Sequence, residues 1–188
     1  MHVVVGLGNP GKTYADTRHN VGFLVVAELA RRWRWQLGPA QHGLRMSEGR
    51  IGDEAVMLVE PQTYMNRSGD PVAALSDVRD RDLIVIHDDL DLGLGRIRVK
   101  FGGGTAGHHG LDSVVEYFGT GFTRVRVGVG RPYEGADTVS FVLSKFTLEE
   151  LEVVNEAVHD AADAVECILR EGTSAAMNRF NAQPQPRT

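Results

Sequence analysis

Two polar side chains that can act on a carbonyl group follow the first apolar run of the chain. Three valines at 3–5 lead into a glycine-rich bend at 6–8, and Asn9 and His19 come next. An asparagine amide donates and accepts hydrogen bonds without carrying charge, and a histidine titrates near neutral pH. Such a pair can bind a carbonyl and move a proton, which is the chemistry of hydrolysis.

A second group of polar side chains follows a β-branched run. Residues 83–86 read Leu-Ile-Val-Ile, typical of a central strand, and His87, Asp88, Asp89 and Asp91 come directly after it. In open α/β sheets, ligands bind at the carboxyl ends of the strands, so a site is expected here. The acidic residues are adjacent, and no paired histidines or cysteines stand at zinc-ligand spacing. A polar turn is therefore favoured over a metal centre.

The glycine-rich bend also matches the dinucleotide-binding fingerprint G-x-G-x-x-G over Gly6–Gly11. That fingerprint needs its third glycine inside a helix whose N-terminus holds the pyrophosphate. Residues 12–20 show no apolar helical stripe, and no acidic residue ends a second strand at the expected separation. A glycine-rich turn without a nucleotide is the better interpretation.

A covalent serine or cysteine hydrolase finds little support. The nucleophile motif G-x-S-x-G is absent from the sequence. The single cysteine, Cys167, lies among Val165, Ile168 and Leu169 in a helical pattern, which predicts a buried core thiol. One cysteine also excludes an internal disulfide and suits a reducing compartment.

Composition limits the class of protein further. The chain has 188 residues, 42% of them apolar, and a formal charge of -5, so its overall field repels a polyanion. Any contact with nucleic acid must therefore use a local basic patch. No apolar run approaches the roughly 20 residues that span a bilayer, and the N-terminus enters a strand without a charged leader. We expect a cytoplasmic protein without a membrane anchor.

Strand and helix patterns alternate along the chain and must position the polar groups. Predicted strands cover about 2–6, 44–51, 55–59, 83–86, 96–101 and 122–129, the second and third forming a hairpin. Predicted helices run from an N-cap at Asn20 to Gly38-Pro39, over 72–75 and 111–118, and between Thr147 and Gly172. This order predicts one α/β domain over 1–180, a mixed twisted sheet flanked by helices (phosphorylase/hydrolase-like), with a flexible tail at 181–188.

Two of these strands, 96–101 and 122–129, alternate apolar and basic residues. In the first, Ile97, Val99 and Phe101 are expected to face inward. The last helix is expected to bury a stripe that begins at Leu148. The cations on the predicted solvent sides are Arg96, Arg98, Lys100, Arg124 and Arg126, and Arg131 follows. If the strands share an edge, these cations form a patch beside the glycine-rich loop 102–107; an ordinary solvated sheet face fits equally well.

Four motifs now resemble, in order, those of bacterial peptidyl-tRNA hydrolase. They are GLGNPGKTYADTRHNVGF (6–23), TYMNRSG (63–69), HDDLDLGLG (87–95) and the GGG…GHHGL run (102–111). The segments 125–132 and 141–146 extend the resemblance almost to the C-terminus. The first motif is long and specific, and four in the same order make coincidence very improbable.

The resemblance implies an enzyme that cleaves the ester joining a peptide to the 3′-terminal ribose of tRNA. It implies that His19 is the general base activating water and that Asp88 orients it. Asn9 and Asn66 would hold the substrate backbone and stabilise the oxyanion.

Tyr14 and Met65 would line the place where the 3′ adenosine and the peptide meet. Lys100, with Arg98 and Arg126, would contact the tRNA backbone. The partner would be the 3′ CCA end and acceptor stem of peptidyl-tRNA, bound by a monomer without metal or cofactor.

One position departs from the family pattern. The family usually has Asn where this chain has His109, and that Asn helps to hold the water and the peptide carbonyl. One expectation is an active enzyme whose pH profile has an additional acid limb at about pH 6–7, from protonation of His109 or His19. Another is a tRNA-binding relative with weak or no turnover. A dinucleotide-dependent oxidoreductase and a metal hydrolase centred on 87–91 remain as rivals of other kinds. The intact Asn9, His19, Asn66 and Asp88 favour the enzyme.

Overall fold

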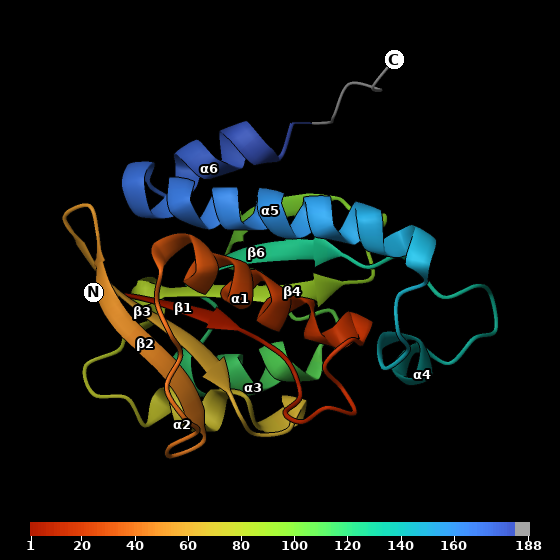
Figure 1. The fold of residues 1–188 in the computed structure, drawn as a ribbon, viewed down its shortest axis with the longest axis horizontal. Helices are drawn as coiled ribbons and strands as arrows, with labels where there is room; N and C mark the ends of the chain where they lie inside the picture. Colours follow the sequence, from red (N-terminus) through yellow and green to blue (C-terminus); the bar gives the residue numbers. More distant parts are fainter. Residues whose placement is uncertain (183–188) are drawn as a thin grey trace.

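A six-stranded mixed sheet forms the centre of the molecule. The computed structural model describes residues 1–182, and its strands lie in the order β2-β3-β1-β4-β6-β5 (Figure 1). The strands β1, β3, β4 and β6 are parallel, whereas β2 and β5 are antiparallel to their neighbours at the two edges. Their bounds are β1 His2–Gly6, β2 Leu44–Ile51, β3 Glu54–Pro61, β4 Leu83–Asp89, β5 Ile97–Phe101 and β6 Thr123–Gly128. The predicted α/β class and the predicted hairpin are confirmed.

Helices cover both faces of the sheet. On one face lie α1 (Val21–Trp33), α5 (Leu148–Glu171) and α6 (Thr173–Phe180), and on the other lie α2 (Gly69–Ala73) and α3 (His109–Phe118) (Figure 1). The short α4 (Thr138–Val142) lies beyond the ends toward which the arrows of β1, β4 and β6 point. Three short 3₁₀ helices, η1 (Arg18–Asn20), η2 (Met65–Arg67) and η3 (Asp80–Asp82), join these elements.

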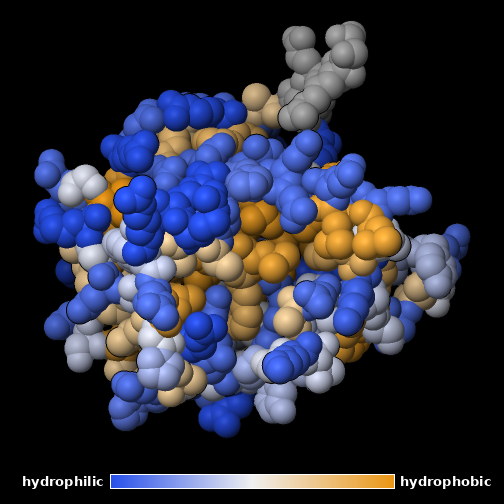
Figure 2. Space-filling model, viewed as in Figure 1, coloured by the Kyte–Doolittle hydropathy of each residue, from blue (hydrophilic) through white to orange (hydrophobic). Residues whose placement is uncertain are grey.

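Residues 3–5 of β1 and 83–86 of β4 are all apolar because helices bury both faces of these strands. In β1, Val4 packs in the core under α1 and α5, while Val3 and Val5 pack in the core under α2 and α3. On the face seen in Figure 2, most of the surface is hydrophilic, and hydrophobic residues show near the middle of the view, between α1 and α5. Within residues 1–182, no helix combines the length and apolarity that crossing a bilayer requires.

Two glycines let α1 lie directly on the sheet. A Cβ atom on Gly22 would lie 2.6 Å from the backbone N and O of Leu7 and 2.7 Å from the carbonyl oxygen of Ile86. A Cβ on Gly6 would overlap the carbonyl oxygen of Gly22. This close approach brings the start of α1, with His19 just before it, over the carboxyl end of β4.

Several local predictions were wrong. The side chain of Asn20 does not cap α1, and the helix ends at Trp33, where Arg34 takes a left-handed conformation with φ 57°. Phe101 is 56% exposed because it ends an edge strand, and Leu148 is 86% exposed because it begins α5 beyond the sheet. Residues 183–188, most of the predicted tail, lie outside the described residues.

Candidate active site

A carboxylate held between two imidazoles lies at the carboxyl end of β4. Asp88 Oδ2 is 2.8 Å from His19 Nδ1, and Asp88 Oδ1 is 2.7 Å from His108 Nε2. The three side chains come from β4, from η1 and from the residue before α3. Asp88 is only 3% exposed and His19 only 9%, so water scarcely competes for these hydrogen bonds.

The surroundings keep Asp88 ionised. Burial alone raises the pKa of a carboxyl group, but the imidazoles of His108 and His19 outweigh that effect and hold the pKa of Asp88 well below its usual range. An ionised carboxylate only accepts hydrogen bonds, so His19 Nδ1 must donate to it. The lone pair of His19 therefore stands on Nε2, as a general base requires.

His19 lies where two cavities meet. Each has a volume of about 320 Å³. Val139 and Val142 of α4, together with His109, line both of them. The first is also lined by the end of β4 and by residues 105–108, and the second by Asn9, Tyr64, Met65, Asn66 and Leu143. A substrate with two unlike arms can be bound with its joining bond at His19.

Asn9 is fixed by hydrogen bonds on both its backbone and its side chain. Its N–H donates to Asn20 Oδ1 and its carbonyl accepts from Asn20 Nδ2, both at 2.9 Å. Its side-chain Oδ1 accepts from the N–H of Met65 at 2.7 Å. The amide NH₂ of Asn9 is therefore left to donate to a ligand, beside the buried Met65 and the exposed Asn66.

Tyr14 is the predicted site residue that the structure places apart from the others. It is half-buried in the turn before η1, where its carbonyl accepts from Thr17 Oγ1 at 2.8 Å. Its side chain lines neither of the two cavities. Asn9, Met65 and Asn66, by contrast, share a cavity with His19, and Asp88 lines the other.

Arg18, the residue before His19, is hydrogen-bonded to the segment that follows α4, the helix that lines both cavities. Its guanidinium is buried and donates to Ser144 Oγ at 3.1 Å and to the carbonyl of Val129 at 3.1 Å. Both terminal nitrogens bind Glu150 in α5, at 2.5 and 3.1 Å. The segment after α4 is thus tied to the residue that precedes the base.

The predicted basic strands do pair at one edge. Arg98 lies opposite Arg126 and Lys100 opposite Arg124, so these four side chains share one face of the sheet. Arg124 is not on a solvent side as predicted: it is 2% exposed and donates to the carbonyls of Gly103 and Gly104. Its burial follows from the glycine-rich loop folding over it.

The other cations on these strands differ in solvent exposure and in whether they form an ion pair. Arg126 is paired with Asp89 at 2.7 Å, whereas Arg98 and Lys100 are exposed. Lys100, Arg124 and Arg126 line a further cavity of about 200 Å³ beside the first one. A basic patch therefore adjoins the site, made mainly by Lys100 and Arg98.

The polar run at 87–91 does not converge on one point. Asp89 binds Arg126, and Asp91 binds Arg131 at 3.0 Å. His87 donates from Nδ1 to the carbonyl of Asp88 at 2.8 Å, and burial, reinforced by the nearby His108, lowers the pKa of His87 to about 4. Each side chain faces a different partner, so a metal centre formed by 87–91 is not supported.

The neighbouring side chains of His108 and His109 point in different directions. The side chain of His109 is 67% exposed, with Nδ1 3.7 Å from Asp112 Oδ2. His108, which was not among the predicted site residues, turns inward to Asp88. The only signal that could have identified it is its place as the residue before a helix, where side chains fold back on the first turn.

The chain is similar to known proteins along almost its whole length. The family model described as Peptidyl-tRNA hydrolase matches residues 3–187. The peptidyl-tRNA hydrolase of Rubrobacter xylanophilus is 53% identical over 95% of this chain and 99% of that protein. That of Bacillus subtilis is 43% identical over 97% of this chain and 100% of that protein. The crystal structure of the enzyme from Acinetobacter baumannii has a TM-score of 0.90 and 36% identity, covering 97% of this chain and 95% of that one.

Proposed function

Since this chain belongs to the peptidyl-tRNA hydrolase family and releases peptides from peptidyl-tRNA, we propose that His19 is the general base of that reaction. One observation carries the proposal. Asp88, buried and ionised, accepts from His19 Nδ1 at 2.8 Å and leaves Nε2 unprotonated where the two cavities meet.

The reaction begins with proton transfer from water to His19 Nε2. The water oxygen bonds to the ester carbonyl carbon, and the carbonyl π electrons move to the oxygen as an oxyanion. The imidazolium that forms faces the carboxylate of Asp88, which stabilises its charge. When the oxyanion collapses, the bond to the ribose 3′ oxygen breaks and His19 returns its proton to that oxygen. A base placed in this way contributes roughly 10²- to 10⁴-fold in rate.

Asn9 and Asn66 are the proposed donors to the substrate and its oxyanion. The Asn9 amide is already held by three hydrogen bonds through its own backbone and Oδ1, so little reorganisation is needed when charge develops. A donor of this kind is worth about 3 to 4 kcal/mol in the transition state. Asn66 is exposed and is expected to align only when substrate is present.

The tRNA body is proposed to lie along the basic patch. Lys100 and Arg98 are exposed on the face of β5 that lies beside Arg126, whose charge is shared by Asp89. Lys100 also lines the cavity of about 200 Å³ next to the first one. Contacts to the 3′ CCA end and acceptor stem would place the ester at His19. We further propose that the enzyme works as a monomer in the cytoplasm and needs no metal.

Hydrolysis of N-acetyl-aminoacyl-tRNA in the presence of a chelator tests these roles. Wild type is expected to stay active, and His19→Ala to lose about 10³-fold or more in kcat. Asp88→Asn should lose about 10²- to 10⁴-fold, because an amide can stabilise the wrong tautomer of His19. The control is His2→Ala, at the opposite end of β1. Equal rates for wild type and His19→Ala would exclude His19 as the base, and loss of activity with chelator would exclude the metal-free mechanism.

A further inference from the structure

His108 satisfies the second oxygen of the acid that orients the base. Its Nε2 lies 2.7 Å from Asp88 Oδ1, whereas His19 contacts the other oxygen, Oδ2. Its side chain is only 10% exposed. Without this hydrogen bond, Oδ1 would be a buried carboxylate oxygen lacking a protein donor, which is costly.

The other nitrogen of His108 caps a helix. Nδ1 accepts from the backbone N–H of Gly110 at 3.1 Å and of Leu111 at 3.2 Å, in the first turn of α3. A ring nitrogen that accepts hydrogen bonds carries no proton, so the proton of the neutral ring is on Nε2. The helix terminus therefore makes His108 a neutral donor aimed at Asp88.

We propose that His108 is a positioning residue for the reaction, which holds the Asp88 carboxylate in the orientation that places Oδ2 on His19 Nδ1. This inference rests on His19 being the general base. Two effects follow from the contact. The carboxylate cannot rotate away from His19 while Oδ1 is held. The N–H of His108 also stabilises part of the negative charge on Asp88, so the carboxylate favours protonation of His19 less strongly.

The other titratable groups around this cluster do not replace Asp88. His87 of β4 is neutral, with its ring centroid 5.2 Å from that of His108, and Asp89 is paired with Arg126. His19 packs against His108 with ring centroids 4.9 Å apart. On the solvent side, α3 contributes the exposed His109 and, next to it, Asp112.

The same contact connects the base to the glycine-rich loop. His108 follows that loop directly, and Thr105, Ala106 and Gly107 line the cavity at Asp88. If the loop moves when tRNA binds, the carboxylate that orients His19 is affected through His108. A continuous series of hydrogen bonds therefore links the start of α3 through His108 and Asp88 to His19.

Two substitutions separate the two nitrogens of His108. In His108→Asn, the amide oxygen stands near the position of Nδ1, so the helix cap is kept while the reach to Asp88 is lost. In His108→Gln, the amide nitrogen reaches the position of Nε2, so the donor to Asp88 is kept while the cap is weakened. Thermal unfolding, circular dichroism, kcat and KM from about pH 5.5 to 9, and NMR titration of the His19 ring are measured for both.

We expect His108→Asn to keep its KM and the helix content of α3, because the cap is kept, while kcat falls about 10-fold or more, because the catalytic geometry loosens. Its melting temperature should fall, because Asp88 Oδ1 is left buried without a donor. The acid limb of its kcat profile and the NMR titration of His19 should move to higher pH. Without the hydrogen bond from His108, the Asp88 carboxylate stabilises protonated His19 more strongly. His108→Gln should melt earlier and keep the wild-type pH profile.

A wild-type rate and pH profile in His108→Asn would overturn the inference and leave His108 as a helix cap only. A His108→Gln variant that folds but shows the pH shift would overturn it as well. His19→Ala separates this outcome from failure of the proposed function: if that variant is inactive while His108→Asn behaves as wild type, only the role of His108 is lost.

Discussion

The side-chain amide of Asn20 binds both backbone polar groups of Asn9. Asn20 Oδ1 accepts from the N–H of Asn9, and Asn20 Nδ2 donates to its carbonyl, each at 2.9 Å. The pair joins the loop after β1 to the residue that follows His19. A proposed oxyanion donor and the proposed base are thereby held in one frame.

Replacing Asn20 by Asp should damage this frame. The carboxylate can still accept from Asn9, but it cannot donate, and it places negative charge beside a carbonyl oxygen. We expect about 2 kcal/mol less free energy of unfolding and at least about 10-fold lower kcat/KM. Urea unfolding and steady-state kinetics measure the two. Asn155→Ala, on the exposed side of α5, is the control, and equal values for both variants would contradict the role of the pair.

Gly22→Ala should separate α1 from the sheet. The new methyl group would stand 2.6 Å from the backbone of Leu7 and 2.7 Å from the carbonyl of Ile86. Overpacking against backbone typically costs about 1 to 3 kcal/mol, and the shift would also move His19 relative to Asp88. A lower urea midpoint together with reduced kcat is the expected result. Ala27→Ser, on the exposed side of the same helix, should change neither.

Lys100→Gln should weaken tRNA binding through phosphate contacts alone. Affinity measured at several salt concentrations is expected to fall, and the slope of log K against log salt should decrease by about 1. The rate constant at saturating substrate should stay near that of wild type. Arg50→Gln, in the β2–β3 hairpin at the other end of the sheet, should leave the slope unchanged. An unaltered slope for Lys100→Gln would exclude a phosphate contact.

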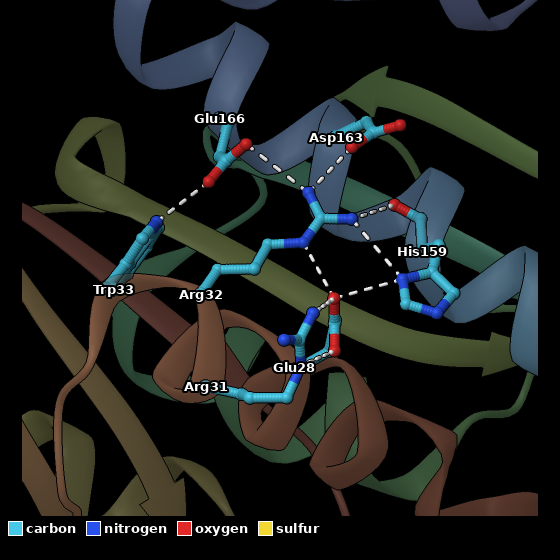
Figure 3. A network of polar contacts seen from close by, with 7 residues as sticks. All are labelled: Glu28, Arg31, Arg32, Trp33, His159, Asp163 and Glu166. Atoms are coloured by element: carbon cyan, nitrogen blue, oxygen red, sulfur yellow. Dashed lines mark hydrogen bonds and ion pairs between the residues drawn. The ribbon is translucent and has the colours of Figure 1, made fainter.

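A polar network far from the site fastens α1 to α5 (Figure 3). Arg32 stands at its centre, 2.7 Å from Glu28, 2.6 Å from Asp163 and 3.3 Å from Glu166. The hydrogen bond from Arg31 lowers the pKa of Glu28 most, and Arg32 and His159 add to it against the effect of burial. The pKa of Glu28 falls from 4.5 to about 2.

The sign of the resulting pH dependence is fixed by that shift. Because the folded-state pKa of Glu28 is depressed, its contribution to stability is complete above 4.5 and is lost as the pH falls toward about 2. Glu28→Gln should therefore be about 1 kcal/mol less stable than wild type at pH 7. The two should converge in that acid range in urea unfolding. Glu152→Gln, an exposed residue of α5, is the control, and a difference that persists at low pH would contradict the account.

His109→Asn tests the departure from the family pattern. Because an acid limb reflects protonation of the base, and Asp88 orients His19 for that role at 2.8 Å, we expect any acid limb in the rate to come from His19. The variant should keep that limb and change kcat by only a few fold, since an asparagine at this position can still donate to substrate. Disappearance of the limb in a pH profile of kcat/KM would assign it to His109 instead.

The sequence alone determined the alternation of strands and helices and the two strand ends that carry the site. Runs such as 3–5 and 83–86 are buried on both faces, so their apolar character is independent of which neighbours they find. The order of the motifs identified the family before any contact was known. The hydrogen-bond partners of individual side chains could not be predicted from apolar patterns or from the order of the motifs.

Only the tertiary structure decided what those side chains touch. Asn20 resembles a helix cap, yet it binds Asn9, and Arg124 alternates like a surface residue, yet the glycine-rich loop covers it. His108 and His109 are the same residue type at adjacent positions, and the start of α3 turns one inward to Asp88 and leaves the other in solvent. Such choices depend on where distant segments meet, because a polar group takes the partner that folding brings within about 3 Å.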